Sequence, residues 1–454
     1  MISGAQIPRR IAVGAAITLS LLLVWTTRLR PFPWERPAQM VYGPPDPPAH
    51  VVDYLEQAYS VAEPAPGHYQ YTGLREACDH MPAADDDTPF LNCVGMVAGI
   101  TSIVAQVKVC LKMAVDTGSH LVLPRMPLRS SEDLTAFNFL NDEAYMAYDE
   151  WFDADHLRRV LGRACPRMRI VHPAELEDGG GGGSIEVKHR WSVSVDQALG
   201  YRKAQSYFWT GRPFKNWFDE QYLRLRFLNN ANPNKDPIKR GITVVNIDSE
   251  FLLFRITDDP TGRELHLWND LSHLVRFREQ PRQIVHNLLQ KLPRPYYGVH
   301  FRVENDTIWS SLENQLKVDL DALDLAWNRF GKPGLQKPLV YLACGDQVQV
   351  EKFVEAGAAR GWEVTHKWKL AKDDPATTQM INSLAFDFQG VVDMGIMVRA
   401  QFFFGITGSA FSSTIAHLRD VTGRYRGSSF DVWDDEGAAS HLFFEGDTQY
   451  ACCL

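Results

Sequence analysis

The clearest pattern in the chain is an alternation of apolar and polar residues from Tyr296 to Glu304. Aromatic and β-branched residues with a period of two predict a β-strand. One face of that strand carries Val299, Phe301 and Val303, which we expect in a core. The opposite face carries Gly298, His300, Arg302 and Glu304. Because buried polar groups need partners, this row predicts a charged ligand near the end of the strand, or an internal ion pair of Arg302 with Glu304 or a neighbour.

Strand and helix patterns alternate through the rest of the second half. Strands are expected at 338–344, 362–366 and 401–406, and helices at 348–360 and 380–399. This order predicts a parallel sheet. The Gly/Ser-rich turn from Thr407 to Thr414 follows the last strand directly and leads into a helix over 415–419. Such a turn suits a diphosphate, and ordinary N-capping by Ser409 or Ser412 is the alternative.

The first half has a related signal, in the order glycine loop, helix and strand. A glycine-punctuated apolar stretch with Gly95 and Gly99 runs into a helix that should stop near Gly118, and a buried strand follows from His120. A glycine loop at a helix N-terminus offers N–H groups to an anion, but a tight packing turn explains it equally well. Further strands are expected at 242–247 and 251–254, and a helix at 271–292, before a hinge at 293–295.

Composition sets the class of protein. The chain has 454 residues, more than one core usually organises, so two or more domains are expected. Hydrophobic residues make up 45% and the net charge is −8, without a long basic run. A globular protein that does not bind nucleic acid is therefore predicted.

The N-terminus has the pattern of a membrane anchor. Arg9 and Arg10 precede an uncharged run from Ile11 to Thr27, and a proline-rich stretch follows. A run of this length is at the short end for a membrane-spanning helix, and a cleaved signal peptide is the competing interpretation. We expect a single-pass type II protein of the Golgi or endoplasmic reticulum membrane, with a luminal catalytic domain behind an extended stem. Ordered structure should begin near Phe90.

The seven cysteines show no zinc-binding spacing. In a secretory lumen some would pair, and Cys78 with Cys93 is plausible because these two residues bracket a polar loop. The one glycosylation sequon begins at Asn305, beside the predicted site, and we expect it to be empty.

Asp153 and Asp155 form a D-x-D triplet, which in some transferases holds a divalent cation. Here the triplet directly precedes a helical pattern. N-capping and first-turn acids therefore explain it better than a metal site.

Taken together, these motifs resemble the GDP-fucose protein O-fucosyltransferases. The resemblance rests on three places: the glycine loop, helix and strand at 94–124; His300-Phe301-Arg302; and the stretch from Val392 to Ser412. It implies a GT-B fold, with two Rossmann-like domains facing a cleft and no metal requirement. It also implies that Arg302 holds the β-phosphate and sugar, and that His300 and Asp393 lie near the base. The phosphate-binding turn would be Ser409, Ala410, Phe411 and Ser412.

One departure concerns the glycine loop. The family commonly has an Asn after the loop glycine, or an acid nearby, whereas here Gly99 is followed by Ile100 and Thr101. The acceptor-side base and the acceptor class therefore stay open. Glu304 is the nearest carboxylate candidate for the base, and it could equally orient Arg302.

The sequence thus predicts an α/β protein of GT-B type behind an N-terminal transmembrane anchor. The expected parts are a tail and anchor (1–30), a stem (31–87), an acceptor-side domain (88–292) and a nucleotide-sugar domain (293–454). The predicted activity is transfer of fucose or a related sugar from a GDP-sugar to a protein or glycan hydroxyl, with inversion. GDP-fucose would be a co-substrate, with Gly95 and Gly99 also binding it, and no cofactor or metal is expected. The alternatives are a manganese-dependent GT-A-like transferase and a non-catalytic sugar-nucleotide or glycan-binding protein.

Overall fold

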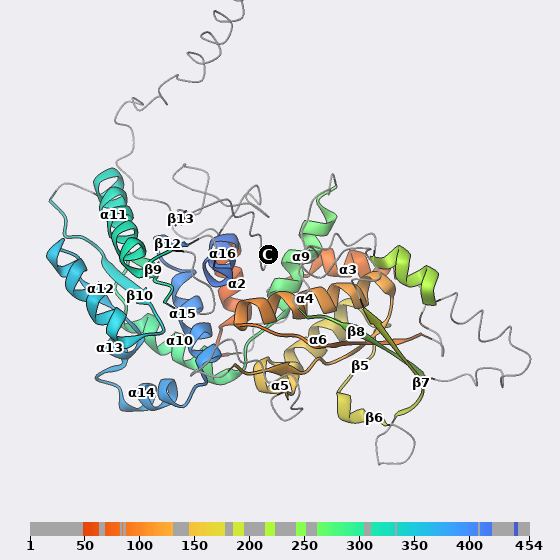
Figure 1. Cartoon of the computed structure of the whole chain (residues 1–454). Helices are drawn as coiled ribbons and strands as arrows, with labels where there is room; N and C mark the ends of the chain where they lie inside the picture. The colour runs from red at the N-terminus through yellow and green to blue at the C-terminus, as the bar shows by residue number, and fades with distance from the viewer. Residues whose placement is uncertain are drawn as a thin grey trace, which may run out of the picture. The chain divides into compact units, whose positions relative to one another are not determined.

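The computed structural model describes thirteen stretches of the chain: 49–62, 69–81, 84, 88–129, 145–177, 185–194, 214–222, 242–250, 261–303, 310–331, 334–406, 409–419 and 440–443. Two parallel sheets form its framework (Figure 1). The predicted α/β class is therefore confirmed.

The first sheet has six strands in the order β5-β2-β1-β8-β7-β6. Their bounds are β1 Phe90–Val94, β2 His120–Val122, β5 Ile170–Val171, β6 Leu176–Glu177, β7 Ile185–Ser194 and β8 Ile242–Asp248. All neighbouring pairs are parallel. A separate antiparallel pair joins β3 (Met126–Pro127) to β4 (Tyr145–Met146). The predicted strands at 120–124 and 242–247 are thus confirmed, whereas the one at 251–254 lies outside the described residues.

The second sheet has five parallel strands in the order β11-β10-β9-β12-β13. Their bounds are β9 Tyr296–His300, β10 Leu339–Ala343, β11 Val364–Thr365, β12 Phe402–Ile406 and β13 Ser440–Phe443. The predicted alternation along β9 is confirmed. Val299 and Phe301 pack in one hydrophobic cluster with α11 (Leu312–Phe330) and α12 (Gln347–Ala359), while Tyr296 packs in another, on the opposite face.

Helices cover both faces of the second sheet. In Figure 1, α11 and α12 lie on one side of β9 and β10, and α15 (Phe386–Met397) and α16 (Ala410–Arg419) lie on the other. The remaining helices of this half are α13 (Lys367–Ala371) and α14 (Pro375–Asn382). The prediction of a single helix over 380–399 is wrong. Residues 383–385 separate α14 from α15.

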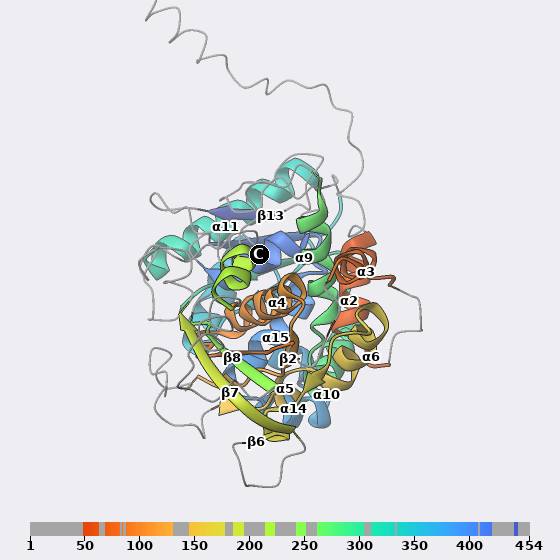
Figure 2. The ribbon, with the colours of Figure 1, turned by 90° about the vertical axis from the view of Figure 1, so that its right-hand side faces the viewer.

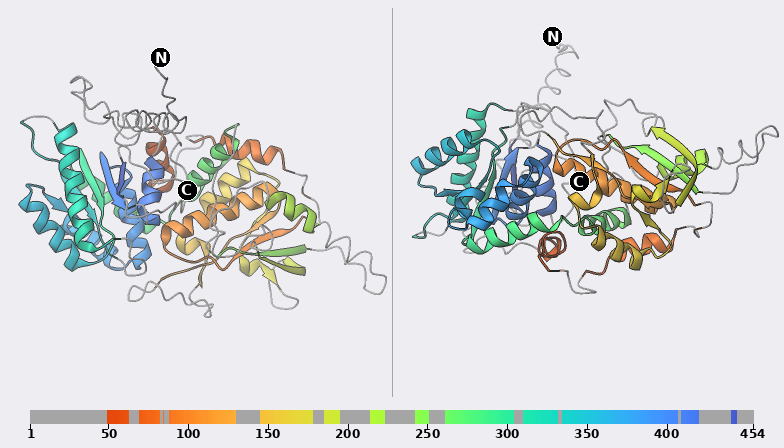
Figure 3. Two further views of the ribbon diagram at one scale, coloured as in Figure 1. Left: turned by 45° about the horizontal axis from the view of Figure 1, so that its top comes forward. Right: turned by 90° about the horizontal axis from the view of Figure 1, so that it is seen from below.

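Helix α4 (Ile100–Thr117) lies along one face of the first sheet and contacts β1 and β2 (Figures 2 and 3). Its C-terminus is closed by Gly118 at φ 69°, a left-handed conformation that glycine adopts without strain, as predicted. The other helices of this half are α2 (Ala49–Ala58), α3 (Thr72–Asp79), α5 (Tyr148–Trp151), α6 (Ala154–Ala164), α9 (Arg263–Leu274), α10 (Glu279–Lys291) and one over residues 214–222, with a 3-10 turn at Pro173–Glu175.

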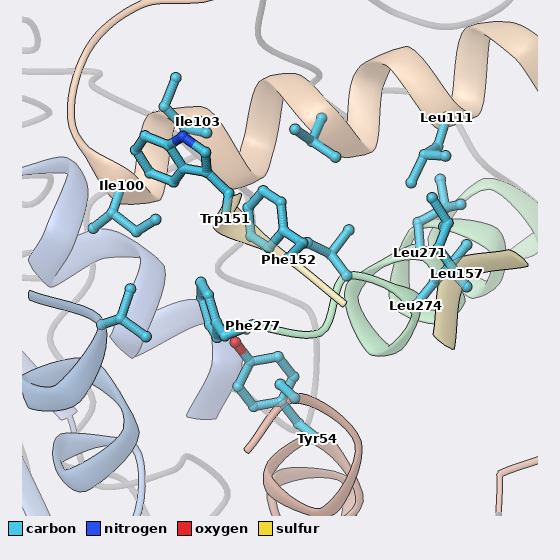
Figure 4. Close-up of a cluster of buried hydrophobic side chains, with 14 of the residues drawn as sticks. Tyr54, Ile100, Ile103, Leu111, Trp151, Phe152, Leu157, Leu271, Leu274 and Phe277 are labelled. Atoms are coloured by element: carbon cyan, nitrogen blue, oxygen red, sulfur yellow. The ribbon is translucent and has the colours of Figure 1, made fainter. Parts of the chain in front are cut away.

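One large hydrophobic cluster unites the helices of the first half, α10 among them, with α15. Figure 4 shows part of it, with Trp151 beside Ile100 and Ile103 at the start of α4. Tyr59 donates a buried hydrogen bond to the carbonyl of Val391 in α15 at 2.9 Å. The expectation that ordered structure begins near Phe90 is therefore wrong, since α2 and α3 already contribute to this core.

Two arginines explain why the predicted helix at 271–292 is divided. Arg276 lies in the extended break between α9 and α10, is 1% exposed, and donates to the carbonyls of Ser60 and Ala62 at 2.8 Å each. Arg282 donates to the carbonyls of Ser60 and Val61. The break thus lets both side chains bind the segment that follows α2.

The predicted pairing of Cys78 with Cys93 is wrong. Cys78 forms a disulfide with Cys165 at the end of α6, and Cys93 with Cys110 in α4. The second bond ties β1 to the helix that follows it. The pairing depends on the packing of α3 against α6, which cysteine spacing does not show.

Among the described residues, no helix is long and apolar enough to cross a membrane. The predicted anchor at 11–27 lies outside these residues, as does the stretch 31–48 of the predicted stem.

Candidate functional site

The candidate site lies where the strand order of the second sheet reverses. From β9 the chain continues to β10 on one side and later returns to β12 on the other. In open α/β sheets, ligands bind beyond the carboxyl ends of the strands at such a switch point. The ends of β9 and β12 bring together His300, Arg302, Ser409 and Ser412, although about a hundred residues separate the two pairs.

His300 is bound to the first turn of α16. Its Nδ1 lies 2.7 Å from the hydroxyl of Ser412, and its ring lies 4.6 Å from that of Phe411. Burial, reinforced by the positive charge of Arg302, lowers the pKa of His300 to about 3. The imidazole is therefore neutral at physiological pH and acts here as a hydrogen-bonding group.

Arg302 reaches the N-terminus of the same helix. Its Nη1 donates to Ser409 Oγ at 3.2 Å, and the backbone N–H of Ser412 approaches that oxygen at 3.5 Å. Ser409 is thus placed as an N-cap, and Ala410, Phe411 and Ser412 form the first turn of α16 rather than a turn before a later helix. A guanidinium and the positive end of a helix dipole meet here, an arrangement that suits an anion.

Gly405 in β12 allows this close approach. A Cβ at residue 405 would clash with the hydroxyl of Ser412, which also accepts the backbone N–H of Ile406 at 3.2 Å. The absent side chain therefore lets the helix start lie directly on the strand end. The glycine before the turn was part of the predicted motif, but its steric role was not.

Asp393 is occupied by interior partners. Its carboxylate accepts a hydrogen bond from Tyr341 and forms an ion pair with Lys367, each at 2.6 Å. Asp393 is 5% exposed and Lys367 is 3% exposed. These contacts do not join Asp393 to the pair of His300 and Ser412. Its predicted place beside the base remains a prediction.

The predicted glycine loop, here residues 95–99, follows β1 at the switch point of the first sheet, between β1 and β8. Gly95 has φ 72°, and Ala98, unusually for a residue with a side chain, has φ 88°. Gly99 is the N-cap of α4 and provides no side-chain hydrogen bond to it. The loop therefore presents backbone groups, in contrast to the serines before and within α16.

The buried side-chain amide of Gln106 holds the glycine loop in place. Gln106 is 1% exposed, accepts the N–H of Val97 at 3.2 Å, and donates to the carbonyl of the same residue at 2.6 Å. One side chain thus satisfies both backbone groups of the residue before the strained Ala98. Sequence reasoning missed Gln106, because a glutamine on a helix is usually solvated.

The two predicted turns meet on α15. A methyl group at Gly390 would lie 3.5 Å from Ile100 Cγ2 and 3.8 Å from Phe411 Cε2. Ile100 opens α4, and Phe411 belongs to the first turn of α16. The glycine loop and the phosphate turn, residues 409–412, are therefore brought together by one helix.

The two aspartates of the D-x-D triplet have separate roles. Asp153 is the N-cap of α6, accepts the N–H of His156 at 2.9 Å, and pairs with Arg276 at 3.2 Å. The capping interpretation of the D-x-D triplet is thus confirmed, and Asp155 is a surface residue 3.8 Å from Arg158. In the part of the chain that the structure describes, no three acidic, His or Cys residues gather as metal ligands.

Glu304 lies outside the described residues, as does the sequon at Asn305. The role predicted for this carboxylate therefore stays a prediction.

Comparison with solved structures finds distant likenesses. POFUT1 in complex with GDP-fucose is 14% identical with a TM-score of 0.41, over 80% of this chain and 99% of that chain. A variant of FUT1 from Arabidopsis thaliana in complex with GDP is 9% identical with a TM-score of 0.37, over 83% and 79%. The fucosyltransferase NodZ from Bradyrhizobium is 14% identical with a TM-score of 0.34, over 71% and 91%.

No protein-family model matches the chain, and a search of curated proteins finds no match. Fucosyltransferases are thus among the solved structures to which this chain is similar, at a distance that leaves its chemistry to be argued from its own residues.

Proposed function

We propose that this protein is a glycosyltransferase of GT-B type that transfers fucose, or a related sugar, from a GDP-sugar to a hydroxyl acceptor. The observation that carries the proposal is the position of Arg302, next to the N-cap of α16 at the switch point of the second sheet. The nature of the donor is taken from the motif resemblance, since a cationic site alone selects only for an anion.

The chemistry follows from the charge that develops as the sugar leaves. Breaking the bond between the sugar and the β-phosphate leaves a diphosphate with additional negative charge. A guanidinium offers two parallel donors to phosphate oxygens, and the first turn of a helix adds N–H groups and its dipole. These groups stabilise the leaving group without a metal ion.

His300 has a supporting part in this proposal. Because the imidazole is neutral and bonded to Ser412, it orients the first turn of α16 instead of transferring a proton. The acceptor hydroxyl would attack the sugar from the face opposite the diphosphate, which gives inversion. Glu304 is the proposed base for that hydroxyl.

We also propose that the protein faces the lumen of the secretory pathway as a single-pass type II membrane protein. The disulfides Cys78–Cys165 and Cys93–Cys110 support an oxidising compartment. The uncharged run at 11–27 supports an anchor. Detergent-dependent extraction of the intact chain tests this proposal, and recovery of that intact chain in the soluble fraction would contradict it.

The decisive experiment replaces Arg302 with Lys, which keeps the charge but loses the paired donors. We expect transfer from GDP-fucose to fall about 100- to 1000-fold, with GDP affinity, measured by calorimetry, reduced less than transfer. A matched control is Arg263→Lys, since Arg263 forms an exposed pair with Glu76 and lies outside the site.

The outcomes separate the alternatives. Normal turnover in Arg302→Lys would show that Arg302 is a structural residue. GDP binding without transfer in the wild type would favour a binding protein. Activity that is lost in EDTA and restored by manganese would favour the metal-dependent alternative.

A further inference from the structure

A long-range ion pair connects the segment after β3 to α15. Arg129 follows β3 in the first half of the chain, and Asp387 lies in the first turn of α15. Arg129 donates to Asp387 Oδ1 from Nη2 at 2.8 Å and from Nε at 3.1 Å. Its backbone N–H donates to Asp387 Oδ2 at 3.2 Å.

The ion pair of Arg129 with Asp387 is largely buried. The side chain of Asp387 is fully buried, and that of Arg129 is 13% exposed. Three donors from one residue therefore surround a carboxylate that has no access to water. A buried charge that loses its partner is strongly destabilising, so the two residues depend on each other.

The guanidinium also packs against the glycine loop. A Cβ at Gly99 would lie 2.6 Å from Arg129 Nη2, well inside contact distance. The absence of a side chain at the N-cap of α4 is thus what admits Arg129. Since Asp387 holds Arg129, the loop rests on a group that is fixed to α15.

The same helix meets the phosphate turn. Ile100, next to Gly99, and Phe411, next to His300, approach the same point of α15 at Gly390. A displacement of the loop on α15 would therefore change its position relative to the phosphate turn.

We infer that Arg129 is a positioning residue. By pairing with Asp387 it fixes the glycine loop, and with it the N-terminus of α4, against α15 in register with the phosphate turn. The catalytic consequence rests on the proposed function, whereas the effect on the loop does not.

The test uses Arg129→Met, Asp387→Asn and the double variant in the full chain. Arg129→Met leaves the buried carboxylate of Asp387 without its two side-chain donors and without a balancing charge, so the melting temperature of this variant should fall. The double variant removes both charges, and Asn keeps an oxygen for the backbone N–H of residue 129. Its melting temperature should therefore return towards the wild-type value.

Two measurements separate an effect on the position of the glycine loop from an effect on the stability of the whole chain. Hydrogen exchange of the backbone amides at 94–101 should become at least about tenfold faster in Arg129→Met and should stay fast in the double variant. Turnover should fall about 100-fold in both, with GDP affinity within about twofold of the wild type, because misplacing one half of a site mainly affects the reaction rate. The exposed pair Arg263 and Glu76 provides a matched control, with Arg263→Met and Glu76→Gln.

Wild-type exchange at 94–101 in the double variant would overturn the inference, as would turnover that returns together with melting temperature. If the wild-type protein neither binds GDP nor transfers sugar, the proposed function fails. The exchange measurement then still decides whether Arg129 positions the loop.

Discussion

The phosphate turn after β12 and the glycine loop after β1 occupy equivalent places in their sheets, yet they are built differently. Each lies at a switch point and at the start of a helix. In the phosphate turn, the side chains of Ser409 and Ser412 interact with Arg302 and His300 from the end of β9. The glycine loop presents backbone N–H and carbonyl groups. Two residues outside the loop, Gln106 and Arg129, hold it in place. A turn held by the side chains of its own residues can be recognised from local sequence, whereas a loop held through its backbone depends on residues that are distant in the sequence.

The largest expected effect concerns the support of the glycine loop. Gln106→Leu would leave the N–H and carbonyl of the buried Val97 without partners. At roughly 1–3 kcal/mol for each buried group, we expect the free energy of unfolding to fall by about 3 kcal/mol. Urea denaturation measures this change. An effect no larger than that of the exposed Gln347→Leu would show that the loop supports itself.

A second prediction concerns the phosphate turn and uses pH. The pKa of His300 is about 3 in the folded chain and 6.5 ordinarily, so below pH 6.5 the unfolded chain binds a proton that the folded chain does not. The free energy of unfolding should therefore fall as the pH falls, by roughly 2 kcal/mol between pH 6.5 and 5 from this residue. His300→Gln should lose correspondingly less over that range than the wild type.

Comparing the two chains at pH 7 and pH 5 removes the contributions of other titrating groups, such as Asp116 and His120, which both chains share. His286→Gln, an exposed histidine on α10, is the control. Equal losses in the wild type and in His300→Gln would mean that the imidazole takes up its proton over the same pH range in the folded and the unfolded chain, which would contradict this prediction.

The smallest expected effect is an increase in the free energy of unfolding. Ala98 has φ 88°, a region that costs a residue with a side chain about 1–2 kcal/mol. Ala98→Gly removes that strain but increases the freedom of the unfolded chain, by roughly 0.5–1 kcal/mol. We expect net stabilisation of about 0.5 kcal/mol by urea denaturation, and a smaller gain in the Gln106→Leu background. A net loss would show that the left-handed conformation is not retained.

The difference between the phosphate turn and the glycine loop also explains which features could be predicted from the sequence. The alternation along β9 and the turn after β12 were read from local periods of two and from the Gly/Ser composition, and the structure joins them through His300 and Ser412. Gly118 was recognised as a helix end because its conformational role is local.

The failures were non-local. Arg129 and Asp387 are 258 positions apart, and neither lies in a pattern that marks it as paired. The cysteine partners and the break between α9 and α10 likewise depend on contacts between distant segments, such as that of Arg276 with Ser60. Local periodicity carries no information about such contacts.

The clamp formed by Arg276 and Arg282 has a consequence for how this region tolerates change. Both guanidiniums bind carbonyl oxygens of residues 60 to 62, which every amino acid possesses, proline included. Apart from one long contact of Arg276 with the hydroxyl of Ser60 at 3.5 Å, the clamp therefore depends on the path of the backbone and not on the identity of the side chains. Substitution of the side chains at residues 60 to 62 should therefore disturb this attachment less than substitution of either arginine.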